Sequence, residues 1–412
     1  MCDPAISNTL VLSISLLMNI LYTITRYWPA IGGAETHVRQ VASALASRHT
    51  VQIAAHTNRQ QVDPIRISTI DALQSDVYSD GATHIQLLGV TSTERMWIRP
   101  AVRLYQYPRT KKLGYWLYAS VFAKKLSQLV RERQIDLIHN VLVGTEYLSH
   151  VSCQVARHHG IPFVITPLVH EGLWGDSDFF LQVYRQADAV IALLNEERRF
   201  YLESGIPSKN IHVIGVSPVL TENYDASFFK KRGIKGKTVL FVGRQIQSKG
   251  YYELLSSAAQ TWARHPDVHF IFVGPNEEAN SVFTQFNDPR IINLGRVSDE
   301  EKTSALAACD IFCLPSNSEI MPTVILEAWH FGKPVIGGSI ATLQELIQNG
   351  ENGLIVRQDP QDISSAIINL LDDPVRSQQM GMSGRQKVQQ YYGIEQVSTQ
   401  LEAVYHNLTG KG

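Results

Sequence analysis

Two cations that follow an apolar run are the first candidates for chemistry. Arg244 and Lys249 lie close together in Val239–Gly250, between a predicted strand and a predicted helix. A guanidinium group is a planar fork and an ammonium group is a compact charge, so the pair suits the oxygens of a diphosphate. Ser248 stands where a Walker loop requires Gly, so this turn is of a different kind. The spacing therefore predicts that Arg244 and Lys249 bind an anionic ligand.

Two carboxylates, Glu319 and Glu327, flank the start of another predicted helix. Pro322 is acceptable in the first turn of a helix, and the N–H groups of Thr323 and Val324 could receive phosphate oxygens. Glu327 could then accept hydrogen bonds from vicinal hydroxyls, as an acidic residue does for ribose in dinucleotide-binding folds. Glu319 would face a sugar. A capping acid beside a surface acid is an alternative that the pattern alone leaves open.

A third candidate is the pair Gly32 and Gly33, which lies between an apolar run and a helical pattern. Without Cβ atoms, the backbone can approach a ligand closely, and the N–H groups of the following helix point toward it. A plain strand-to-helix turn also explains a lone Gly-Gly pair, and motif specificity alone favours that explanation.

Asp176 and Asp178 form an Asp-x-Asp pair of the kind that binds metal ions in some enzymes. They precede the apolar-periodic run Phe179–Ala187. A helix cap and a first-turn acid therefore explain them better. The sequence predicts no metal site.

The elements that hold these residues alternate between short apolar runs and amphipathic stretches. In the front half, strands are predicted at residues 20–25, 51–55, 85–88, 137–139, 163–166, 189–193 and 211–214, and helices at 35–47, 114–133, 145–159 and 195–204. In the back half, strands are predicted at residues 238–242, 269–273, 291–294, 311–314, 334–336 and 354–356. This repetition of strand and helix indicates parallel sheets covered by helices.

We therefore predict an α/β protein with two Rossmann-like, doubly wound parallel-sheet domains that face each other across a cleft. A length of 412 residues agrees with two cores. The predicted limits are 1–215 for the N-terminal domain and 216–393 for the C-terminal domain, with a helix in 394–412 that packs back on the first domain. Open parallel sheets bind ligands at the carboxyl ends of their strands, so we expect the site between the domains.

Composition excludes several other classes of protein. Apolar residues make up 44% and charged residues 18% of the chain, which is typical of globular proteins and not of disordered ones. The net charge of −1 gives no general attraction to nucleic acid. The four cysteines lack disulfide or zinc spacing, which indicates a reducing compartment.

The N-terminal stretch 9–24 is largely apolar, but no Lys or Arg precedes Arg26, which argues against a secretory signal. The stretch is also short and interrupted for a membrane span. We interpret residues 1–17 as an extension of unknown order and residues 19–25 as a buried first strand.

Residues 95–133 form a basic and aromatic segment with ten Lys or Arg against the single acid Glu132. A solvated face, an acceptor-binding surface and contact with an anionic membrane leaflet are all compatible with it. Lys124 and Lys125, with Tyr118 and Phe122 on the same predicted helix, would suit a membrane surface.

Several motifs, in order, give the chain a resemblance to the retaining glycosyltransferases of group 1, also called GT4, which have the two-domain GT-B fold. The motifs are Gly243-Arg244 to Lys249-Gly250, Glu319 to Glu327-Ala328, Gly332–Ile336 and Asn349–Val356. The resemblance implies that the C-terminal domain binds a nucleotide-sugar donor and the N-terminal domain the acceptor. The donor-binding residues it implies are Gly32, Gly33, Gly243, Arg244, Lys249, Glu319, Met321, Pro322, Thr323, Val324 and Glu327.

The resemblance also implies a chemistry. His170, in Thr166–His170, corresponds to a histidine near the reacting sugar, and with Glu319, Arg244 and Lys249 it is expected to be catalytic. Cations and helix N–H groups would stabilise the charge that develops on a departing diphosphate, without a metal or other cofactor. The expected donor is a UDP- or GDP-sugar, and the expected acceptor is a carbohydrate or a lipid-linked molecule.

The expected enzyme is a cytoplasmic hexosyltransferase of the kind used in polysaccharide biosynthesis, with a peripheral membrane contact through residues 95–133 as a further option. Two alternatives remain. One is a sugar-nucleotide epimerase or hydrolase of the same fold, which needs no acceptor. The other is a non-catalytic subunit that binds nucleotide sugars, although Arg244, Lys249, Glu319 and Glu327 are all present.

Overall fold

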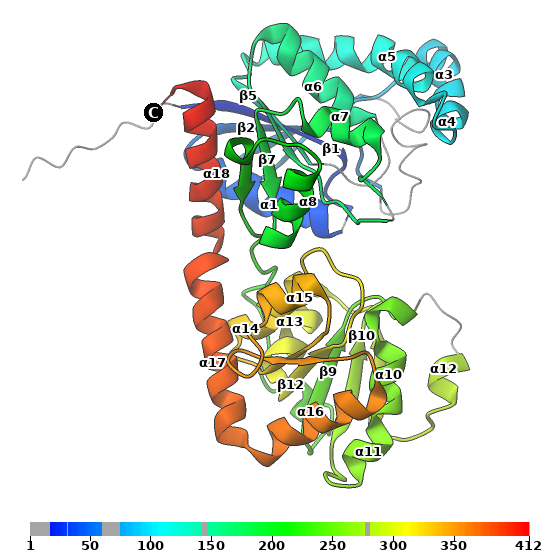
Figure 1. Cartoon of the computed structure of the whole chain (residues 1–412), viewed down its shortest axis with the longest axis vertical. Helices are drawn as coiled ribbons and strands as arrows, with labels where there is room; N and C mark the ends of the chain where they lie inside the picture. The colour runs from blue at the N-terminus through cyan, green and yellow to red at the C-terminus, as the bar shows by residue number, and fades with distance from the viewer. Residues whose placement is uncertain are drawn as a thin grey trace, which may run out of the picture.

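The computed structural model describes residues 17–30, 32–59, 75–141, 147–172, 174–276 and 281–411. These residues form two α/β domains, one above the other in Figure 1, with the last two helices running along one side of both. Residues 1–16, which include most of the proposed N-terminal extension, lie outside the described part of the chain. Among the described residues, no helix is long and apolar enough to cross a membrane.

The first domain is built on an eight-stranded sheet in the order β3-β4-β2-β1-β5-β6-β7-β8. All neighbours are parallel except β3 and β4, which pair antiparallel. From β1 the chain builds outward to one edge and then returns to β5 on the other side of β1, so the sheet is doubly wound. The strands are β1 (Asn19–Arg26), β2 (Thr50–Thr57), β3 (Asp76–Asp80), β4 (Thr83–Leu87), β5 (Leu137–Val141), β6 (Phe163–Thr166), β7 (Ala189–Ala192) and β8 (Ile211–Val213).

Helices cover both faces of this sheet. One hydrophobic cluster lies under α5 and α6, and a second lies under α1 and the C-terminal helix α18. The helices of this part of the chain are α1 (Gly33–Leu45), α3 (Ser92–Ile98), α4 (Pro100–Tyr105), α5 (Lys111–Glu132), α6 (Leu148–His159), α7 (Asp178–Tyr184) and α8 (Asn195–Glu203), with α18 at Ile394–Thr409.

The second domain has a six-stranded, all-parallel sheet in the order β11-β10-β9-β12-β13-β14. Its order reverses between β9 and β12. The strands are β9 (Thr238–Val242), β10 (His269–Val273), β11 (Ile291–Gly295), β12 (Ile311–Leu314), β13 (Val335–Gly338) and β14 (Leu354–Val356). The helices are α9 (Phe228–Lys231), α10 (Tyr251–Ser256), α11 (Ala258–Trp262), α12 (Ser281–Thr284), α13 (Asp299–Ala308), α14 (Thr323–His330), α15 (Ala341–Leu346), α16 (Pro360–Asp372) and α17 (Pro374–Tyr391).

The prediction of two doubly wound parallel-sheet domains is thus confirmed. β3 was not predicted, because its residues are mostly exposed and carry no run of apolar side chains. The limits at residues 215 and 393 stay a prediction. α17 still packs on the second domain through α14 and α16, whereas α18 packs on α1 of the first.

The chain passes between the domains twice, and the two passages touch. Gly215 follows β8, and Tyr392 separates α17 from α18. A Cβ on Gly215 would lie 2.6 Å from Cε1 of the Tyr392 ring, so only glycine allows this approach. The side chain of Tyr392 therefore packs directly on the backbone of the first passage.

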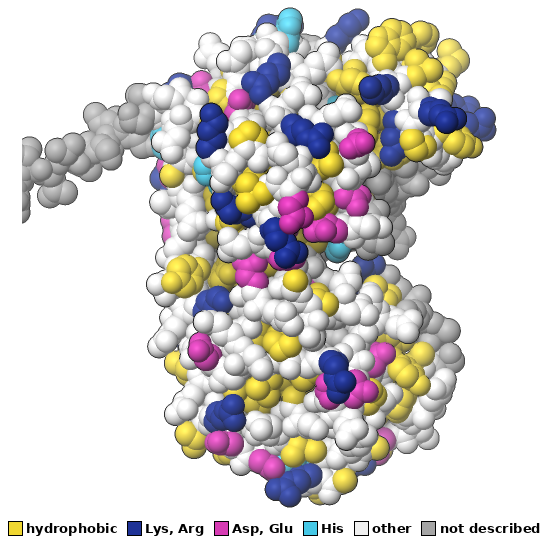
Figure 2. All heavy atoms as spheres, in the orientation of Figure 1, with side chains coloured by type: hydrophobic (Ala, Val, Ile, Leu, Met, Phe, Trp, Pro, Cys, Tyr) yellow, Lys and Arg dark blue, Asp and Glu magenta, His cyan; other side chains and the backbone are white. Residues whose placement is uncertain are grey.

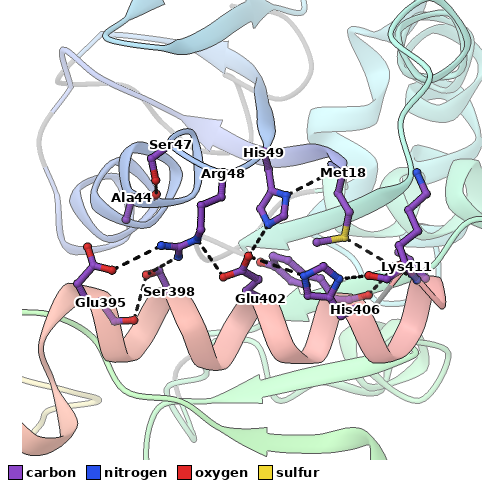
Figure 3. Close-up of polar contacts among 12 residues, drawn as sticks. Met18, Ala44, Ser47, Arg48, His49, Glu395, Ser398, Glu402, His406 and Lys411 are labelled. Carbon is purple, nitrogen blue, oxygen red and sulfur yellow. Dashed lines mark hydrogen bonds and ion pairs between the residues drawn. The ribbon is translucent and has the colours of Figure 1, made fainter. Parts of the chain in front are cut away.

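Buried hydrogen bonds hold α18 on the first domain. The hydroxyl of Tyr405 lies 2.6 Å from the hydroxyl of Tyr22 and 2.6 Å from Nδ1 of His139. At the rim of this contact, Glu402 lies 3.0 Å from Nε of Arg48 and 2.8 Å from Nε2 of His49 (Figure 3). The C-terminal helix is thus part of the core of the N-terminal domain.

The basic segment forms α3, α4 and α5 at one end of the first domain. Tyr118 and Phe122 are fully buried there, so neither side chain is part of the membrane-facing surface that was one of the three interpretations of this segment. α5 turns their side of the helix toward the sheet. Figure 2 shows Lys and Arg side chains beside hydrophobic ones at this end of the molecule. The exposed large hydrophobic side chains here are Met96, Trp97, Tyr107, Leu113 and Trp116.

Candidate functional site

Two hollows lie between the domains, at the carboxyl ends of strands from both sheets. The larger has a volume of about 480 Å³ and the smaller about 220 Å³. Four of the predicted segments follow strand ends that meet here: Gly32 follows β1, His170 follows β6, Lys249 follows β9 and Glu319 follows β12. The doubly wound topology therefore brings distant parts of the sequence to one cleft.

The larger cavity places the glycine turn of the first domain opposite α14 of the second. Its walls come from both domains, so a ligand here would contact both. They include Trp28, Ala30, Gly32, Gly33, Glu35, Thr36 and Arg39 from the first, and Val219, Asp299, Lys302, Thr323, Val324 and Glu327 from the second.

The two glycines have different surroundings. Gly32 is the N-cap of α1, and a Cβ there would lie 2.3 Å from Oε2 of Glu35. Glu35 is buried and forms an ion pair with Arg26, with 2.5 Å between Nε and Oε1. A Cβ on Gly33 would meet no atom within 4 Å. Gly32 thus makes room for a buried ion pair, whereas Gly33 leaves space at the cavity.

The start of α14 forms the facing wall. Pro322 is its N-cap, one residue before the first-turn position that the sequence predicted. The helix begins with Thr323 and Val324. Their N–H groups are in its first turn and therefore have no carbonyl acceptor within the helix. Because the helix dipole adds positive potential at this end, these groups suit an anion.

Glu327 lies in the same helix and is only 1% exposed. Its Oε1 accepts a hydrogen bond from the N–H of Val219 at 3.3 Å, and Nζ of Lys302 lies 3.1 Å from Oε2. Burial raises the pKa of Glu327, and the charge of Lys302 opposes that rise. The carboxylate that the sequence predicted to bind hydroxyls therefore lies in the cavity wall beside a cation.

Lys249 and Glu319 form an ion pair in the second domain. Nζ of Lys249 lies 2.6 Å from Oε1 of Glu319 and donates to the carbonyl of Ser318 at 3.1 Å. Lysine has three N–H donors, so one stays available for a further acceptor. The charges of Lys249 and Arg244 both act on the same histidine, because both lower its pKa.

That histidine is His170. Burial, followed by the positive charges of Lys249 and Arg244, lowers its pKa to about 4, so its imidazole is neutral near pH 7. Two backbone hydrogen bonds of 3.0 and 2.9 Å join it to Trp174, and the two rings lie 4.1 Å apart, centre to centre. Leu168, two residues earlier, has a φ of 50°, which L-residues rarely adopt. The loop after β6 thus holds His170 in a fixed orientation.

His170 of the first domain and Glu319 of the second both line the smaller cavity. Glu171, Glu196 and Glu197 of the first domain, and Ser318, Ile320 and Thr342 of the second, are also among its walls. Segment 318–327 therefore borders both cavities, with Met321 and Pro322 between them. Met321 packs against the core of the second domain and Pro322 is buried. The walls of these two cavities do not include five of the predicted residues, namely Gly243, Arg244, Lys249, Met321 and Pro322.

Several polar residues between the domains were not predicted from the sequence. Lys302 and Asp299 lie on α13 and Arg39 lies on α1, in helices whose polar positions look like ordinary solvated faces. Glu345 accepts hydrogen bonds from the N–H groups of Asn195 and Glu196 at 2.7 and 2.8 Å, which links α15 to the start of α8 in the other domain. Only knowledge of the domain arrangement identifies these contacts.

The Asp-x-Asp pair lies at the start of α7. Asp178 is in the first turn, as predicted, but the N-cap is Ser177 and Asp176 does not cap the helix. Instead, Oδ2 of Asp176 accepts a hydrogen bond from the N–H of Gly172 at 2.6 Å. Asp176 therefore stabilises the loop that carries His170.

Among the described residues, His49, Glu402 and His406 form a group whose potential ligand atoms lie within 4.8 Å of one another. Nδ1 of His49 accepts the N–H of Met18 at 3.3 Å, so its proton lies on Nε2 and points to Glu402. A metal would need that nitrogen to be unprotonated. The arrangement in Figure 3 is therefore a hydrogen-bonded contact that holds α18.

Two family profiles match the two halves of the chain. The profile described as "Glycosyl transferase 4-like domain" matches residues 32–217, and the one described as "Glycosyl transferases group 1" matches residues 236–373. The first match contains the glycine turn and His170, and the second contains Arg244, Lys249, Glu319 and Glu327.

Curated relatives extend over almost the whole chain. Phosphatidyl-myo-inositol mannosyltransferase of Mycobacterium tuberculosis is 30% identical over 400 residues, which cover 92% of this chain and 94% of the relative. Glycogen synthase of the same species is 24% identical over 420 residues, with 94% of each chain covered.

Solved structures share the fold. Sucrose-phosphate synthase of Thermosynechococcus elongatus superposes with a TM-score of 0.71 at 20% identity, over 96% of this chain and all of that one. The Anabaena protein HepE, crystallised with UDP-glucose, superposes with a TM-score of 0.69 at 17% identity, over 95% of this chain and all of that one.

Two facing, doubly wound domains with a polar cleft between them define this protein as a GT-B glycosyltransferase that uses a nucleotide sugar. Within that class, the chain belongs to the group 1 glycosyltransferase family, GT4.

Proposed function

We propose that this protein is a retaining, metal-independent hexosyltransferase that moves a sugar from a nucleotide-diphosphate sugar to a carbohydrate or lipid-linked acceptor. The observation that carries the proposal is that His170 of the first domain and Glu319 of the second, with its ion-pair partner Lys249, border one cavity between the domains. The positive charges of Lys249 and Arg244 also act on His170, and two cations near a neutral imidazole suit a site where a diphosphate meets a sugar.

The donor diphosphate would lie between the two domains. Arg244, the remaining N–H of Lys249 and the N–H groups of Thr323 and Val324 are its proposed donors, and Gly33 gives it space on the opposite wall. Glu327 would accept hydrogen bonds from the ribose. Glu319, held by Lys249 beside the smaller cavity, would bind the transferred sugar.

Cleavage of the sugar–phosphate bond gives the sugar oxocarbenium character and leaves negative charge on the diphosphate. The cations and the start of α14 stabilise that charge, and the loss of one such donor in other enzymes costs about 10²–10³ in kcat. The acceptor hydroxyl attacks the face that the phosphate leaves and passes its proton to a phosphate oxygen, so the configuration is retained. Neutral His170 orients a sugar hydroxyl by donating from one ring nitrogen and accepting at the other.

A GDP- or UDP-sugar is the proposed donor. The relative from Mycobacterium tuberculosis is named for mannosyl transfer to phosphatidyl-myo-inositol. A relative from Corynebacterium glutamicum, 25% identical over 313 residues and covering 68% of this chain and 78% of its own length, is named as GDP-mannose-dependent. These names support a GDP-sugar donor and a lipid-linked acceptor.

A lipid-linked acceptor fits a cytoplasmic protein that touches the membrane through residues 95–133. Trp97 and Trp116 are exposed there, with their rings 6.4 Å apart, and this end of the molecule also carries several Lys and Arg side chains (Figure 2). Each cation near an anionic leaflet contributes about 1 kcal/mol. Co-sedimentation with anionic vesicles should fall on paired substitution of Trp97 and Trp116 by Ala, whereas vesicle binding that is unchanged by these substitutions and by salt would refute the contact.

The experiment that tests the function starts with calorimetric titration of the protein with UDP-, GDP- and ADP-sugars, followed by transfer assays with and without EDTA. Lys249→Ala and Glu327→Ala should each lower turnover by about 10²–10³. The matched control is Lys237→Ala, because Lys237 is a surface lysine paired with Asp310. NMR of the product anomer tests retention. Turnover without an acceptor would favour an epimerase or hydrolase, and tight binding without turnover would favour a non-catalytic subunit.

A further inference from the structure

Lys302 on α13 lies against Glu327. In the proposed function, Glu327 is the carboxylate that accepts hydrogen bonds from the ribose of the donor. We infer that Lys302 is a positioning residue that keeps Glu327 ionised and thereby able to accept two hydrogen bonds from the donor at neutral pH. This inference rests on the proposed function, because it concerns how the donor site works.

Lys302 acts on Glu327 by direct contact. Nζ lies 3.2 Å from Oε1 and 3.1 Å from Oε2 of Glu327, and it donates to the carbonyl of Val219 at 3.1 Å. The hydrogen bonds to Oε1 of Glu327 and to the carbonyl of Val219 use two of the three N–H donors of the ammonium group, and the contact with Oε2 is an ion pair without a hydrogen bond. Oε2 of Glu327 has no hydrogen-bond partner among the described residues, so this oxygen stays available to a ligand while Lys302 holds the other one.

The other charges near Glu327 do not replace Lys302. Asp299, on the same helix, is negative and opposes ionisation of Glu327. Across the cavity, Glu35 is paired with Arg26, and Arg39 is paired with Asp80 at 2.7 Å. Among the described residues, Lys302 is the cation within hydrogen-bond distance of this buried carboxylate.

Removal of the ammonium group has a definite direction of effect. Burial raises the pKa of Glu327 and Lys302 lowers it, so without Lys302 the carboxyl holds its proton at a higher pH. A protonated carboxyl has lost the charge that strengthens its hydrogen bonds to hydroxyls. We expect donor affinity near pH 7 to fall about tenfold or more and to recover as the pH is raised.

The test is calorimetric titration of GDP-mannose and of UDP-glucose, separately, into the full-length protein between pH 6 and pH 9. Intact nucleotide sugars are used because free nucleoside diphosphates have a phosphate that titrates near pH 6, at about the second pKa of a phosphomonoester. The variants are Lys302→Met, which removes the charge, Lys302→Arg, which keeps it, Glu327→Gln, which cannot ionise, and the double variant Lys302→Met/Glu327→Gln. Lys237→Met is the matched control, because its partner Asp310 lies outside both cavities.

Wild type, Lys302→Arg and Lys237→Met should bind with an affinity that changes little with pH. Lys302→Met should bind more tightly as the pH rises, and Glu327→Gln should be weak at every pH, with or without Lys302→Met. A Lys302→Met profile parallel to wild type, or a pH dependence that persists in the double variant, overturns the inference.

Thermal melts of each variant separate these effects from loss of the fold. If Lys302→Met does not fold, the inference is tested with Lys302→Arg. A donor affinity that stays near the wild-type value at every pH supports the inference, and an affinity that changes with pH overturns it. If wild type binds neither nucleotide sugar, the proposed function itself fails, and the inference fails with it. Binding by wild type with an unchanged Lys302→Met profile overturns the inference alone.

Discussion

The two adjacent glycines of the N-terminal turn should respond in opposite ways to the same substitution. Gly33→Ala adds a methyl group that meets no atom within 4 Å, at a helical position where alanine is favourable. The fold should therefore keep its stability or gain up to about 0.5–1 kcal/mol. The added methyl group lies at the larger cavity, however, and would push the donor away from the α1 backbone.

Gly32→Ala should instead destabilise the fold. Its methyl group would lie 2.3 Å from Oε2 of Glu35 and 3.0 Å from Nη2 of Arg26, so their ion pair must move. A hydrogen bond between charged groups contributes about 1.5–3 kcal/mol, and 1 kcal/mol shifts the Tm of a domain of this size by about 2–4 °C. We expect Gly32→Ala to lower the Tm by about 3–12 °C.

The assays are thermal melts and steady-state kinetics with the donor identified by calorimetry. A displacement of about 1 Å from the reacting geometry costs about 10² in rate, so Gly33→Ala should lower kcat/KM by about that factor at an unchanged Tm. Wild-type kinetics for Gly33→Ala would show that the glycine turn does not touch the donor. Equal melts for the two variants would refute the distinction drawn from the Arg26–Glu35 pair.

Three further predictions address the cleft and the core. Lys249→Ala should lower kcat by about 10²–10³, with Lys237→Ala at wild-type rate, and equal rates for the two variants would contradict a role of Lys249 at the diphosphate. Glu345→Ala removes hydrogen bonds of 2.7 and 2.8 Å between the domains and should weaken donor binding in calorimetry by about tenfold at a nearly constant Tm; unchanged affinity would refute this role. The free energy of unfolding, measured by urea denaturation, should be lower at pH 5.0 than at pH 7.5 by about 2 kcal/mol for each buried histidine. In the unfolded chain the imidazole binds a proton near pH 6.5, whereas in the folded protein it stays neutral until about pH 3–4. Stability is thus present above pH 6.5 and lost below it; equal values at the two pH values would refute the assignment to His37, His56 and His139.

The fold was predictable because nearly every strand is an apolar run that helices cover on both faces. β9, β10 and β12 were predicted at their observed limits for this reason. β3 escaped prediction because it is an exposed edge strand, in which no face has to be apolar. Where burial does not constrain the residue type, a single sequence contains little information on structure.

The candidate site was predictable where local motifs contain it and not where the domain arrangement creates it. The segments around Lys249 and Glu319 follow strands, so their place at a strand end could be read from the pattern. Lys302 looked like any charged residue of a surface helix, and its contact with Glu327 depends on how α13 packs on α14. The burial of Phe122 was missed for a similar reason, since a basic helix gives no sign of which side meets the sheet.

The contact between Gly215 and Tyr392 has a mechanical consequence. Since both connections between the domains pass through this one place, it is the natural hinge for a rotation of one domain against the other. Sliding of one domain along the other would pull the aromatic ring off the glycine. A larger residue at position 215 would push the Tyr392 ring away and change the angle between the two domains, at a place outside both cavities.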